Sequence, residues 1–334
     1  MALPVAVLGA GSFGTCLALL CAREHDVTLW ARDATIAEAI NSERRNPRFL
    51  SEFEIPERVR ATADLTRALA DCELLICAIP SHGVREVMAR ASAAMPDDCI
   101  LVSTVKGIET GSCKRMDEVL RDVLAPAHHP RLTFLSGPSF ASEIAAGRPT
   151  VVTVACWEIA YAISVQESLS SPWFRCYTAR DVIGVELGGA LKNVIAIAVG
   201  ICDGLGLGDN ARAAVMTRGL REITRLGVAM GADPLTFLGL AGMGDLILTC
   251  TGDLSRNRRV GLALGRGEKL ETVLASMNEV AEGVRTTEAA CELGKRQGVG
   301  LPIMEMVLDL FHGRVSATEG AQRLMTRQLR SENE

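Results

Sequence analysis

The chain has 334 residues, of which 48% are hydrophobic and 22% charged, with a formal net charge of −5. This length suits two domains, each able to bury its own core. The composition excludes an intrinsically disordered protein, and the negative charge disfavours a broad nucleic-acid-binding surface, although one basic cluster, SRNRR, stands at residues 255–259.

Eleven cysteines are scattered along the chain without any CxxC pair, most of them in apolar runs. This usage favours small buried side chains in a reducing compartment over disulfides or zinc, so we expect no metal site. The N-terminal stretch lacks the basic segment of a signal peptide, and no run approaches the roughly 20 uninterrupted apolar residues of a membrane span. We therefore expect a cytoplasmic protein without a membrane span.

The first half of the chain alternates strand-like and helix-like segments. Strands are expected at residues 5–10, 26–31, 73–79, 99–105, 131–137 and 150–156. This alternation predicts a mostly parallel, doubly wound sheet with right-handed crossovers. After about residue 180 the strand pattern disappears, and helices are expected at 182–202, 210–230, 258–264, 286–297 and 303–311. We therefore expect an α/β domain at 1–180 and an all-α domain at 181–334.

The stretch GAGSFG, residues 9–14, joins the first expected strand to the first helix. Gly9, Gly11 and Gly14 match G-x-G-x-x-G: they permit the tight turn, the approach of a pyrophosphate to the backbone, and close helix–strand packing. The pyrophosphate would lie on the helix N-terminus, whose first N–H groups lack partners. In this context the motif predicts a dinucleotide-binding domain of the Rossmann type. The alternative is a plain strand–turn–helix connection.

The second expected strand ends in TLWARD. An NAD-specific site places Asp or Glu at the end of this strand to bind the ribose 2′-hydroxyl. Here Trp30 or Ala31 holds that place and Arg32 follows, whose guanidinium suits a 2′-phosphate. We therefore expect NADPH as the preferred cofactor, with NADH as the other candidate. The alternative is that Arg32 is a solvated loop charge.

The segment DVIGVELGGALKNVIAIAVGICDG, residues 181–204, predicts a long apolar helix with Lys192 at its middle. A helical side chain leans back over positions i−3 and i−4, here Gly189 and Gly188. These glycines would leave a hollow for part of a ligand, where the ammonium could protonate a carbonyl oxygen as hydride arrives at carbon. Asn193 could orient a neighbouring group. The alternative is a lysine that reaches solvent past a glycine-mediated helix contact.

The segment GMGDLILTCTGDLSRNRRVG, residues 242–261, carries a further polar pattern. Asp245 and Thr249 are four residues apart and share a helix face. Ser255 stands where an N-cap is expected, and a helix that begins with Ser255, Arg256 and Asn257 is a good receptor for a phosphate group. The alternative is a capped basic helix in solvent.

Eight blocks stand out in chain order: GAGSFGT, PSH (80–82), KGIE (106–109), SGPSFASEIAAGRPT (136–150), GVELGGALKNVIAIAVG, GMGDLILTCT, SRNRR and AEG (281–283). Together they resemble the bacterial NAD(P)-dependent glycerol-3-phosphate dehydrogenases, through essentially the whole chain and in the order of that family. The resemblance implies a reversible reduction of dihydroxyacetone phosphate, the small-molecule substrate, to sn-glycerol 3-phosphate. In bacteria this reaction supplies the backbone of phospholipids.

The resemblance also implies site residues. Lys192 matches the catalytic lysine and Lys106 a second lysine near substrate and cofactor, and Asp245 is the third catalytic candidate. With the residues argued above, the substrate-binding candidates are Lys106, Gly137, Ser139, Lys192, Asn193, Asp245, Thr249, Ser255, Arg256 and Asn257. The cofactor-binding candidates are Gly9, Gly11, Ser12, Phe13, Gly14, Arg32, Lys106, Ala141, Arg256, Val280 and Glu282. Repulsion from Lys106 is expected to lower the pKa of Lys192, and Asp245 to limit that shift.

Three other functions remain as alternatives: a two-domain reductase for a different hydroxy acid, a catalytically idle dinucleotide sensor, and a structural or interaction protein. Such reductases can share a Lys–Asn pair on a helix, but they do not explain SRNRR. An idle sensor does not need Lys106, Lys192 and Asp245 together, and an interaction protein does not need a phosphate-binding turn. The sequence leaves the oligomeric state open, with a homodimer as one candidate.

Overall fold

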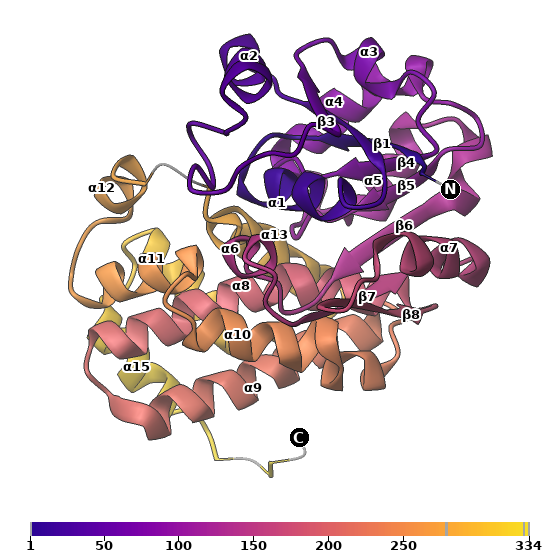
Figure 1. Cartoon of the computed structure of the whole chain (residues 1–334). Coiled ribbons are helices and arrows are strands. Elements are labelled where there is room, and N and C mark those ends of the chain that lie inside the picture. Colours follow the sequence, from indigo (N-terminus) through magenta and orange to yellow (C-terminus); the bar gives the residue numbers. More distant parts are fainter. Residues whose placement is uncertain (1, 278–279, 330, 333–334) are drawn as a thin grey trace.

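The computed structural model describes residues 2–277, 280–329 and 331–332. An α/β region built on one sheet lies against a helical region formed by the second half of the chain (Figure 1). The last strand ends at Ala179 and the long helix that follows begins at Val182. The change of structural type therefore falls at these residues.

The sheet has eight strands in the order β3-β2-β1-β4-β5-β6-β7-β8 among the residues described. Neighbouring strands are parallel except for β6 and β7, so the predicted mostly parallel, doubly wound sheet is confirmed. The strands are β1 Pro4–Leu8, β2 Asp26–Trp30, β3 Val59–Thr62, β4 Leu74–Cys77, β5 Ile100–Ser103, β6 Leu132–Ser136, β7 Thr150–Ala155 and β8 Phe174–Ala179.

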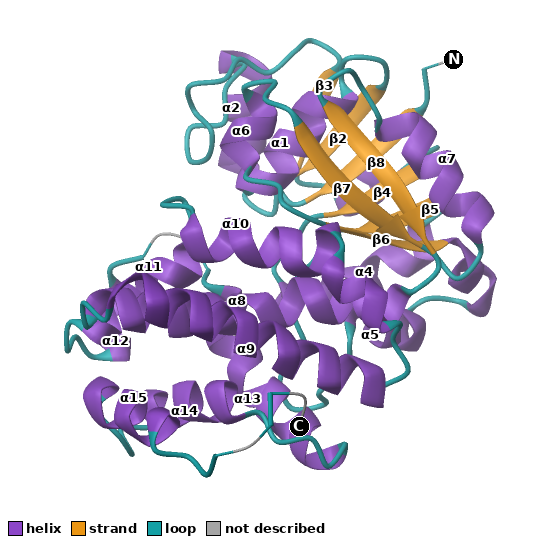
Figure 2. Ribbon diagram, turned by 90° about the horizontal axis from the view of Figure 1, so that it is seen from below, coloured by secondary structure: helices purple, strands orange, loops and turns teal. Residues whose placement is uncertain are grey.

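Helices cover both faces of this sheet (Figure 2). Buried side chains of α1 and α7 pack on one face, and those of α3, α4 and α5 on the other. Because both faces are covered, β1 and β4 are runs of almost wholly buried side chains. The helices of this region are α1 Ser12–Cys21, α2 Ala34–Glu43, α3 Leu65–Leu69, α4 Val84–Ala91, α5 Met116–Val123, α6 Ala141–Ala145 and α7 Ile159–Leu169, with short 3₁₀ turns η1 Ser81–Gly83, η2 Ser92–Ala94 and η3 Pro126–Arg131.

The helical region is organised around α8, Val182–Gly204, which packs against α9, α10, α11, α13 and α14. Asp181 caps α8 by accepting from the Gly184 N–H, and its other oxygen accepts from Thr236 Oγ1 at 2.6 Å. The helices after α8 are α9 Gly208–Ala229, α10 Asp245–Thr251, α11 Arg256–Gly265, α12 Leu270–Ala275, α13 Glu282–Arg296, α14 Pro302–Phe311 and α15 Ala317–Met325, with a 3₁₀ turn η4 Pro234–Leu238 and a π-helical turn η5 Leu240–Gly244.

Within the part of the chain that the structure describes, one helix, α8, is long and apolar enough to cross a membrane by length and composition. This differs from the expectation drawn from uninterrupted apolar runs, because Glu186, Lys192, Asn193 and Asp203 interrupt the apolar residues of α8. Within the protein, 89% of its most apolar window is buried, as expected for a helix at the centre of a core. All eleven cysteines are free and ten of them are buried, in agreement with their predicted use as small hydrophobic side chains.

Candidate functional site

The predicted site residues of the α/β region gather at one edge of the sheet, where the parallel strands end. The turn GAGSFG follows β1, η1 follows β4, Lys106 follows β5 and Gly137 follows β6. The strand order reverses between β1 and β4. In open α/β sheets, ligands bind in the crevice at such a reversal, outside the carboxyl ends of the strands.

The glycines of GAGSFG have the geometry that a dinucleotide requires. Gly9 has φ +112°, a conformation that favours glycine. A Cβ at Gly14 would overlap the carbonyl oxygen of Gly9, whereas a Cβ at Gly11 would meet nothing within 4 Å. Gly11 precedes α1 and offers no side-chain cap. The open space above Gly11 therefore lies at a helix N-terminus, which fits a pyrophosphate group.

Asn46 supports this turn, although no sequence pattern predicted it. Its side chain is buried and donates to Ala10 O at 2.9 Å and to Thr15 Oγ1 at 2.8 Å. Its Oδ1 accepts from the backbone N–H groups of Arg48 and Phe49. The loop after α2 is thus tied to the glycine turn. Asn46 stands in a polar stretch, where nothing in the sequence distinguishes it.

The other cofactor candidates of this region lie around the same turn. Ser12 and Phe13 are the first residues of α1, and Ala141 is the first residue of α6, which packs against α1. Arg32 follows β2 and is exposed. Since β2 is two strands away from β4 in the sheet, Arg32 lies apart from the lysine cluster described next.

Lys192 and Lys106 share one carboxylate. Lys192 Nζ lies 3.0 Å from Asp245 Oδ1 and donates to Thr249 Oγ1 at 2.6 Å. Lys106 Nζ donates to Asp245 Oδ2 at 2.7 Å and to Gly137 O at 2.9 Å, and it lies 3.5 Å from Ser139 Oγ. The structure therefore brings together the three catalytic candidates and three further substrate-binding candidates, Gly137, Ser139 and Thr249.

The side chain of Lys192 is buried, and this burial lowers its pKa to about 8. The carboxylate of Asp245 opposes the fall, and the Lys106 ammonium adds to it. Asp245 and Lys106 act in the predicted directions, and burial is the largest cause of the shift in pKa. Two ammonium groups around one carboxylate leave a net positive charge, which suits an anionic ligand.

Gly188 does not contribute to the predicted hollow beneath Lys192, and Gly189 lines a small pocket that Lys106, not Lys192, helps to enclose. A Cβ at Gly188 would lie 2.7 Å from Ala241 O, and a Cβ at Gly189 would lie 2.6 Å from Ser136 Oγ. The two glycines instead let α8 approach η5, which precedes Asp245, and the end of β6. Gly188 contacts the backbone of η5, and Gly189 leaves room for the Ser136 and Lys106 side chains, so Asp245 and Lys106 come close to Lys192.

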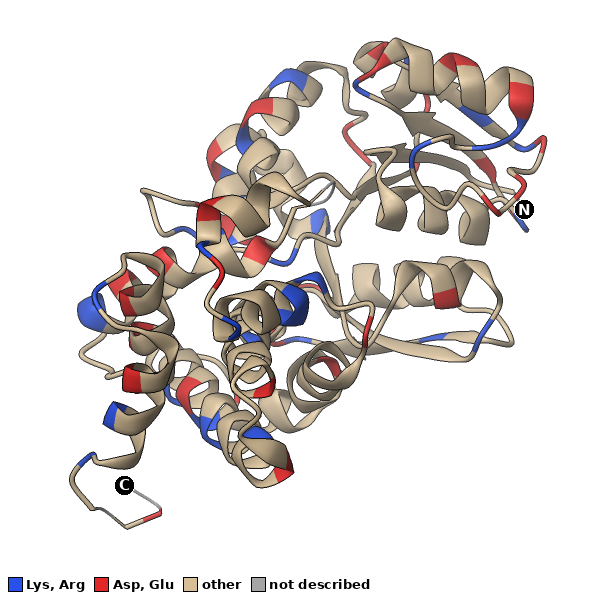
Figure 3. Cartoon of the chain, turned by 90° about the vertical axis from the view of Figure 1, so that its left-hand side faces the viewer, with Lys and Arg blue, Asp and Glu red and all other residues tan. Residues whose placement is uncertain are grey.

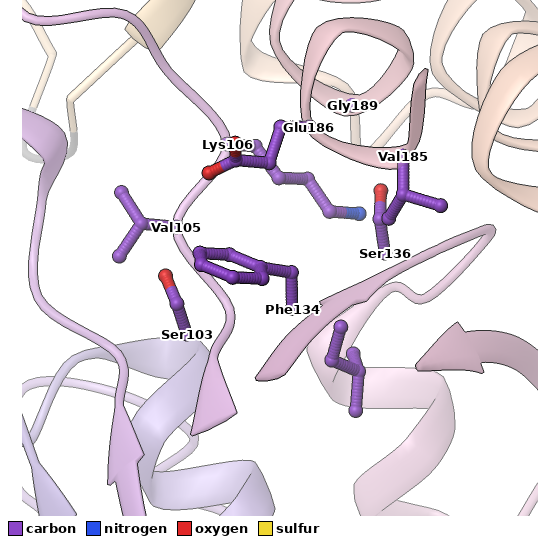
Figure 4. A pocket seen from close by; sticks show the side chains of 9 residues that line it. Ser103, Val105, Lys106, Phe134, Ser136, Val185, Glu186 and Gly189 are labelled. Atoms are coloured by element: carbon purple, nitrogen blue, oxygen red, sulfur yellow. The ribbon is translucent and has the colours of Figure 1, made fainter. Parts of the chain in front are cut away.

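A small, partly open pocket lies on the Gly189 side of α8 (Figure 4). Lys106, Ser136 and Gly189 contribute to its wall, as do Ser103 and Glu186. Glu186 accepts from the Asp117 N–H at 2.9 Å and lies 3.4 Å from Arg115 Nε, so it joins α8 to the start of α5. Burial raises the pKa of Glu186 well above its usual range.

The start of α11 is joined to α8 by an amide pair. Asn257 Nδ2 donates to Asn193 Oδ1 at 2.9 Å, and Asn257 Oδ1 accepts from the Gly283 N–H at 3.0 Å. Ser255 caps α11 by accepting from the Arg258 N–H, as predicted. Arg256, half-buried, is the first residue of this helix. The predicted phosphate receptor therefore lies beside the residue that follows Lys192.

The family model described as the NAD-dependent glycerol-3-phosphate dehydrogenase N-terminus matches residues 4–162, and that of the C-terminus matches residues 181–322. The chain belongs to this family. A glycerol-3-phosphate dehydrogenase [NAD(P)+] of Myxococcus xanthus is 54% identical over 327 residues, 98% of each chain. The protein is therefore an NAD(P)-dependent oxidoreductase.

Solved structures agree with this assignment. A glycerol-3-phosphate dehydrogenase from Coxiella burnetii is 36% identical, with a TM-score of 0.92, covering 98% of this chain and 99% of that one. A ketopantoate reductase from Ralstonia eutropha is only 16% identical, with a TM-score of 0.62, covering 95% and 99%. That second likeness shows the fold alone, and it explains why the fold could not by itself exclude another two-domain reductase.

In this dehydrogenase a direct contact joins the two structural regions at the nucleotide edge. Glu282, at the start of α13, accepts from Ser81 N at 2.9 Å and from Ser81 Oγ at 2.5 Å. Glu282 was a predicted cofactor contact, but its partner in PSH was not predicted. Val280, two residues before it, is half-buried.

Lys, Arg, Asp and Glu residues are interspersed over both regions (Figure 3).

Proposed function

We propose that the protein catalyses the reversible reduction of dihydroxyacetone phosphate to sn-glycerol 3-phosphate, with NADPH preferred over NADH. In this role it supplies the backbone for phospholipid synthesis. The observation that carries the proposal is the pairing of Lys192 and Lys106 on Asp245, beside the N-terminus of α11. This cluster combines a buried proton donor with positive charge for an anionic substrate.

When bound, the nicotinamide cofactor would supply a hydride for C2 of the substrate in the proposed mechanism. Lys192 donates the proton to the carbonyl oxygen. Its pKa of about 8 leaves it mostly protonated at neutral pH, and a lysine with a lowered pKa gives up its proton more easily than an ordinary one. Lys106 binds the substrate on the side of its carbonyl oxygen, and the contacts of Lys106 with Gly137 O and Asp245 orient its ammonium group. Arg256 and the α11 N-terminus bind the phosphate group.

Further assignments belong to the same proposal. Residues 1–180 form the dinucleotide-binding domain and residues 181–334 the substrate-binding and catalytic domain. The substrate site comprises Lys106, Gly137, Ser139, Lys192, Asn193, Asp245, Thr249, Ser255, Arg256 and Asn257. The cofactor site comprises Gly9, Gly11, Ser12, Phe13, Gly14, Arg32, Lys106, Ala141, Arg256, Val280 and Glu282. We assign the protein to the cytoplasm.

We also propose a homodimer. Exposed apolar side chains on the adjoining elements η4, η5 and α10 support it: Leu235, Leu238, Met243 and Ile247 are 37–69% exposed. A patch of this kind favours a second protein surface over solvent. Light scattering of the purified protein tests the assembly, and a mass of one chain at micromolar concentration would overturn it.

Steady-state oxidation of NADPH with dihydroxyacetone phosphate tests the activity. The matched variant is Arg256→Ala, compared on dihydroxyacetone phosphate and on dihydroxyacetone, which has no phosphate to bind. We expect kcat/KM for the phosphorylated substrate to fall by about 10²-fold or more, and that for dihydroxyacetone to change little. Turnover of a 2-keto acid but not of dihydroxyacetone phosphate would instead support the other two-domain reductases.

A further inference from the structure

A cluster of ion pairs joins the start of α11 to α8 and α9, and the proposed mechanism does not use it. Its centre is Asp203, near the end of α8, whose side chain is 7% exposed. Arg258 Nε donates to Asp203 Oδ2 at 2.8 Å. From α9, Arg212 donates through Nε and a terminal nitrogen to Oδ1 at 2.9 and 2.8 Å. Asp203 therefore pairs with two arginines, one on each side.

The position of Asp203 on α8 relates this cluster to the lysine cluster. Asp203 follows Lys192 by eleven residues, which is about three turns of helix, so the two side chains leave α8 on nearly the same face. Asn193 and Asp203 each hold one residue of the segment 255–258: Asn193 pairs with Asn257 and Asp203 with Arg258. The start of α11 is thus attached to α8 at two levels along the helix.

Backbone contact between the two helices leaves little freedom for α11. A Cβ at Gly200 would overlap the carbonyl oxygen of Arg258, and a Cβ at Gly261 would overlap that of Ile197. Gly200 on α8 and Gly261 on α11 therefore let the helix backbones touch. At such a contact α11 cannot move closer to α8, and the freedom that remains is to slide or turn along it. A directional polar contact at its N-terminal end can suppress that sliding.

Arg258 is that contact. Its N–H is capped by Ser255 Oγ at 3.2 Å, while its guanidinium holds Asp203 and also reaches Asp253 at 3.0 Å. The same residue thus engages the hydroxyl of the substrate-binding turn with its backbone and the anchor on α8 with its side chain. The Asp253 side chain is 99% exposed, so we expect the Arg258–Asp253 ion pair to add little to stability.

We propose that Arg258 and Asp203 are positioning residues, which fix the turn Ser255–Asn257 at the depth where it binds the substrate phosphate. The inference rests on the proposed assignment of that turn as the phosphate site. Neither residue touches the substrate in this scheme. The neighbouring Arg259 is exposed and provides a matched control on the same helical turn.

The test compares Arg258→Met, Arg258→Lys, Asp203→Asn and the control Arg259→Met. Arg258→Met keeps the aliphatic stem, and Arg212 still neutralises Asp203, so no buried charge is left uncompensated. We expect kcat/KM for dihydroxyacetone phosphate to fall by about 10- to 100-fold, as for a misplacement of about 1 Å. The values for dihydroxyacetone and the KM for NADPH should change by less than about twofold. Arg258→Lys and Asp203→Asn should give intermediate losses, and Arg259→Met none.

Two comparisons separate the possible failures. Equal losses on both substrates in Arg258→Met, or no loss on either, would overturn the positioning role, because a general effect on the fold does not distinguish the phosphate. If Arg258→Met does not fold, Arg258→Lys and Asp203→Asn carry the same comparison. If Arg256→Ala changes the ratio of the two substrates but the Arg258 variants do not, the positioning role fails alone. If Arg256→Ala leaves that ratio unchanged, the phosphate site itself is wrong, and the inference falls with it.

Discussion

The substitution Asp245→Asn tests how the site controls the proton donor. Burial lowers the pKa of Lys192 to about 8, and Asp245 makes the largest contribution that opposes the fall. At the 3.0 Å separation of Lys192 Nζ and Asp245 Oδ1, an effective dielectric constant of about 20 gives an attraction of about 5.5 kcal/mol, several times the ~1.4 kcal/mol of one pKa unit. The amide removes this attraction, whereas Lys106 remains.

Relaxation and water entry will reduce the effect, so we expect the pKa of Lys192 to fall by at least about one unit, to about 7 or below. The assay is kcat/KM for dihydroxyacetone phosphate as a function of pH. Proton donation needs the ammonium form, so the wild-type value should be level below about pH 8 and fall above it. Oxidation of glycerol 3-phosphate needs the neutral amine and should rise through the same pH.

In Asp245→Asn this transition should move to lower pH, so that more activity remains at about pH 6 than at about pH 8. Asp253→Asn is the control, because the Asp253 side chain is 99% exposed and its loss should leave the transition in place. A transition that stays at about pH 8 in Asp245→Asn, or that moves upward, refutes the idea that Asp245 sets the pKa of Lys192.

Three further substitutions probe the rest of the site. Lys192→Ala should fold, since alanine favours helix, and should lower kcat by at least ~10²-fold in the same assay; near-normal turnover would place the proton donor elsewhere. Arg32→Ala should raise the KM for NADPH by roughly 10- to 150-fold and leave that for NADH nearly unchanged, and equal effects on both would show that Arg32 does not bind the 2′-phosphate. Gly188→Ala places a Cβ 2.7 Å from Ala241 O, so the free energy of unfolding in denaturant titration should fall by about 1–3 kcal/mol. The value of kcat should also fall, because Asp245 shifts with η5. If stability and kcat are both unchanged, η5 moves freely.

The sheet was predictable at its centre and not at its edges. Central strands are buried on both faces and read as apolar runs, so six of them were found. The two strands that were missed, β3 and β8, are the edge strands, in which buried and exposed side chains alternate. Arg60 in β3 and Arg175 in β8 face solvent and interrupt the apolar pattern. Charged edges of this kind discourage pairing with another sheet.

The site was predictable where chemistry is local and less so where it depends on distant contacts. The glycine turn and the Ser255 cap follow from residues close in sequence. The pairing of Lys106 with Asp245 joins residues 139 positions apart, and no spacing rule reports it. The role of Gly188 was misjudged for the same reason, because its neighbour η5 comes from another part of the chain. Contacts that depend on packing between distant segments can be identified only when the fold is known.

The apolar character of α8 has a consequence during synthesis on the ribosome. When Val182–Gly204 has emerged, α11 and α13, which cover it, have not yet been translated. The nascent chain then displays a helix that matches a membrane span in length and hydropathy. Until residues near 296 are translated, the helices that bury this segment are absent, so its apolar surface is open to aggregation. Chains truncated between α8 and α13 should therefore be poor candidates for soluble expression.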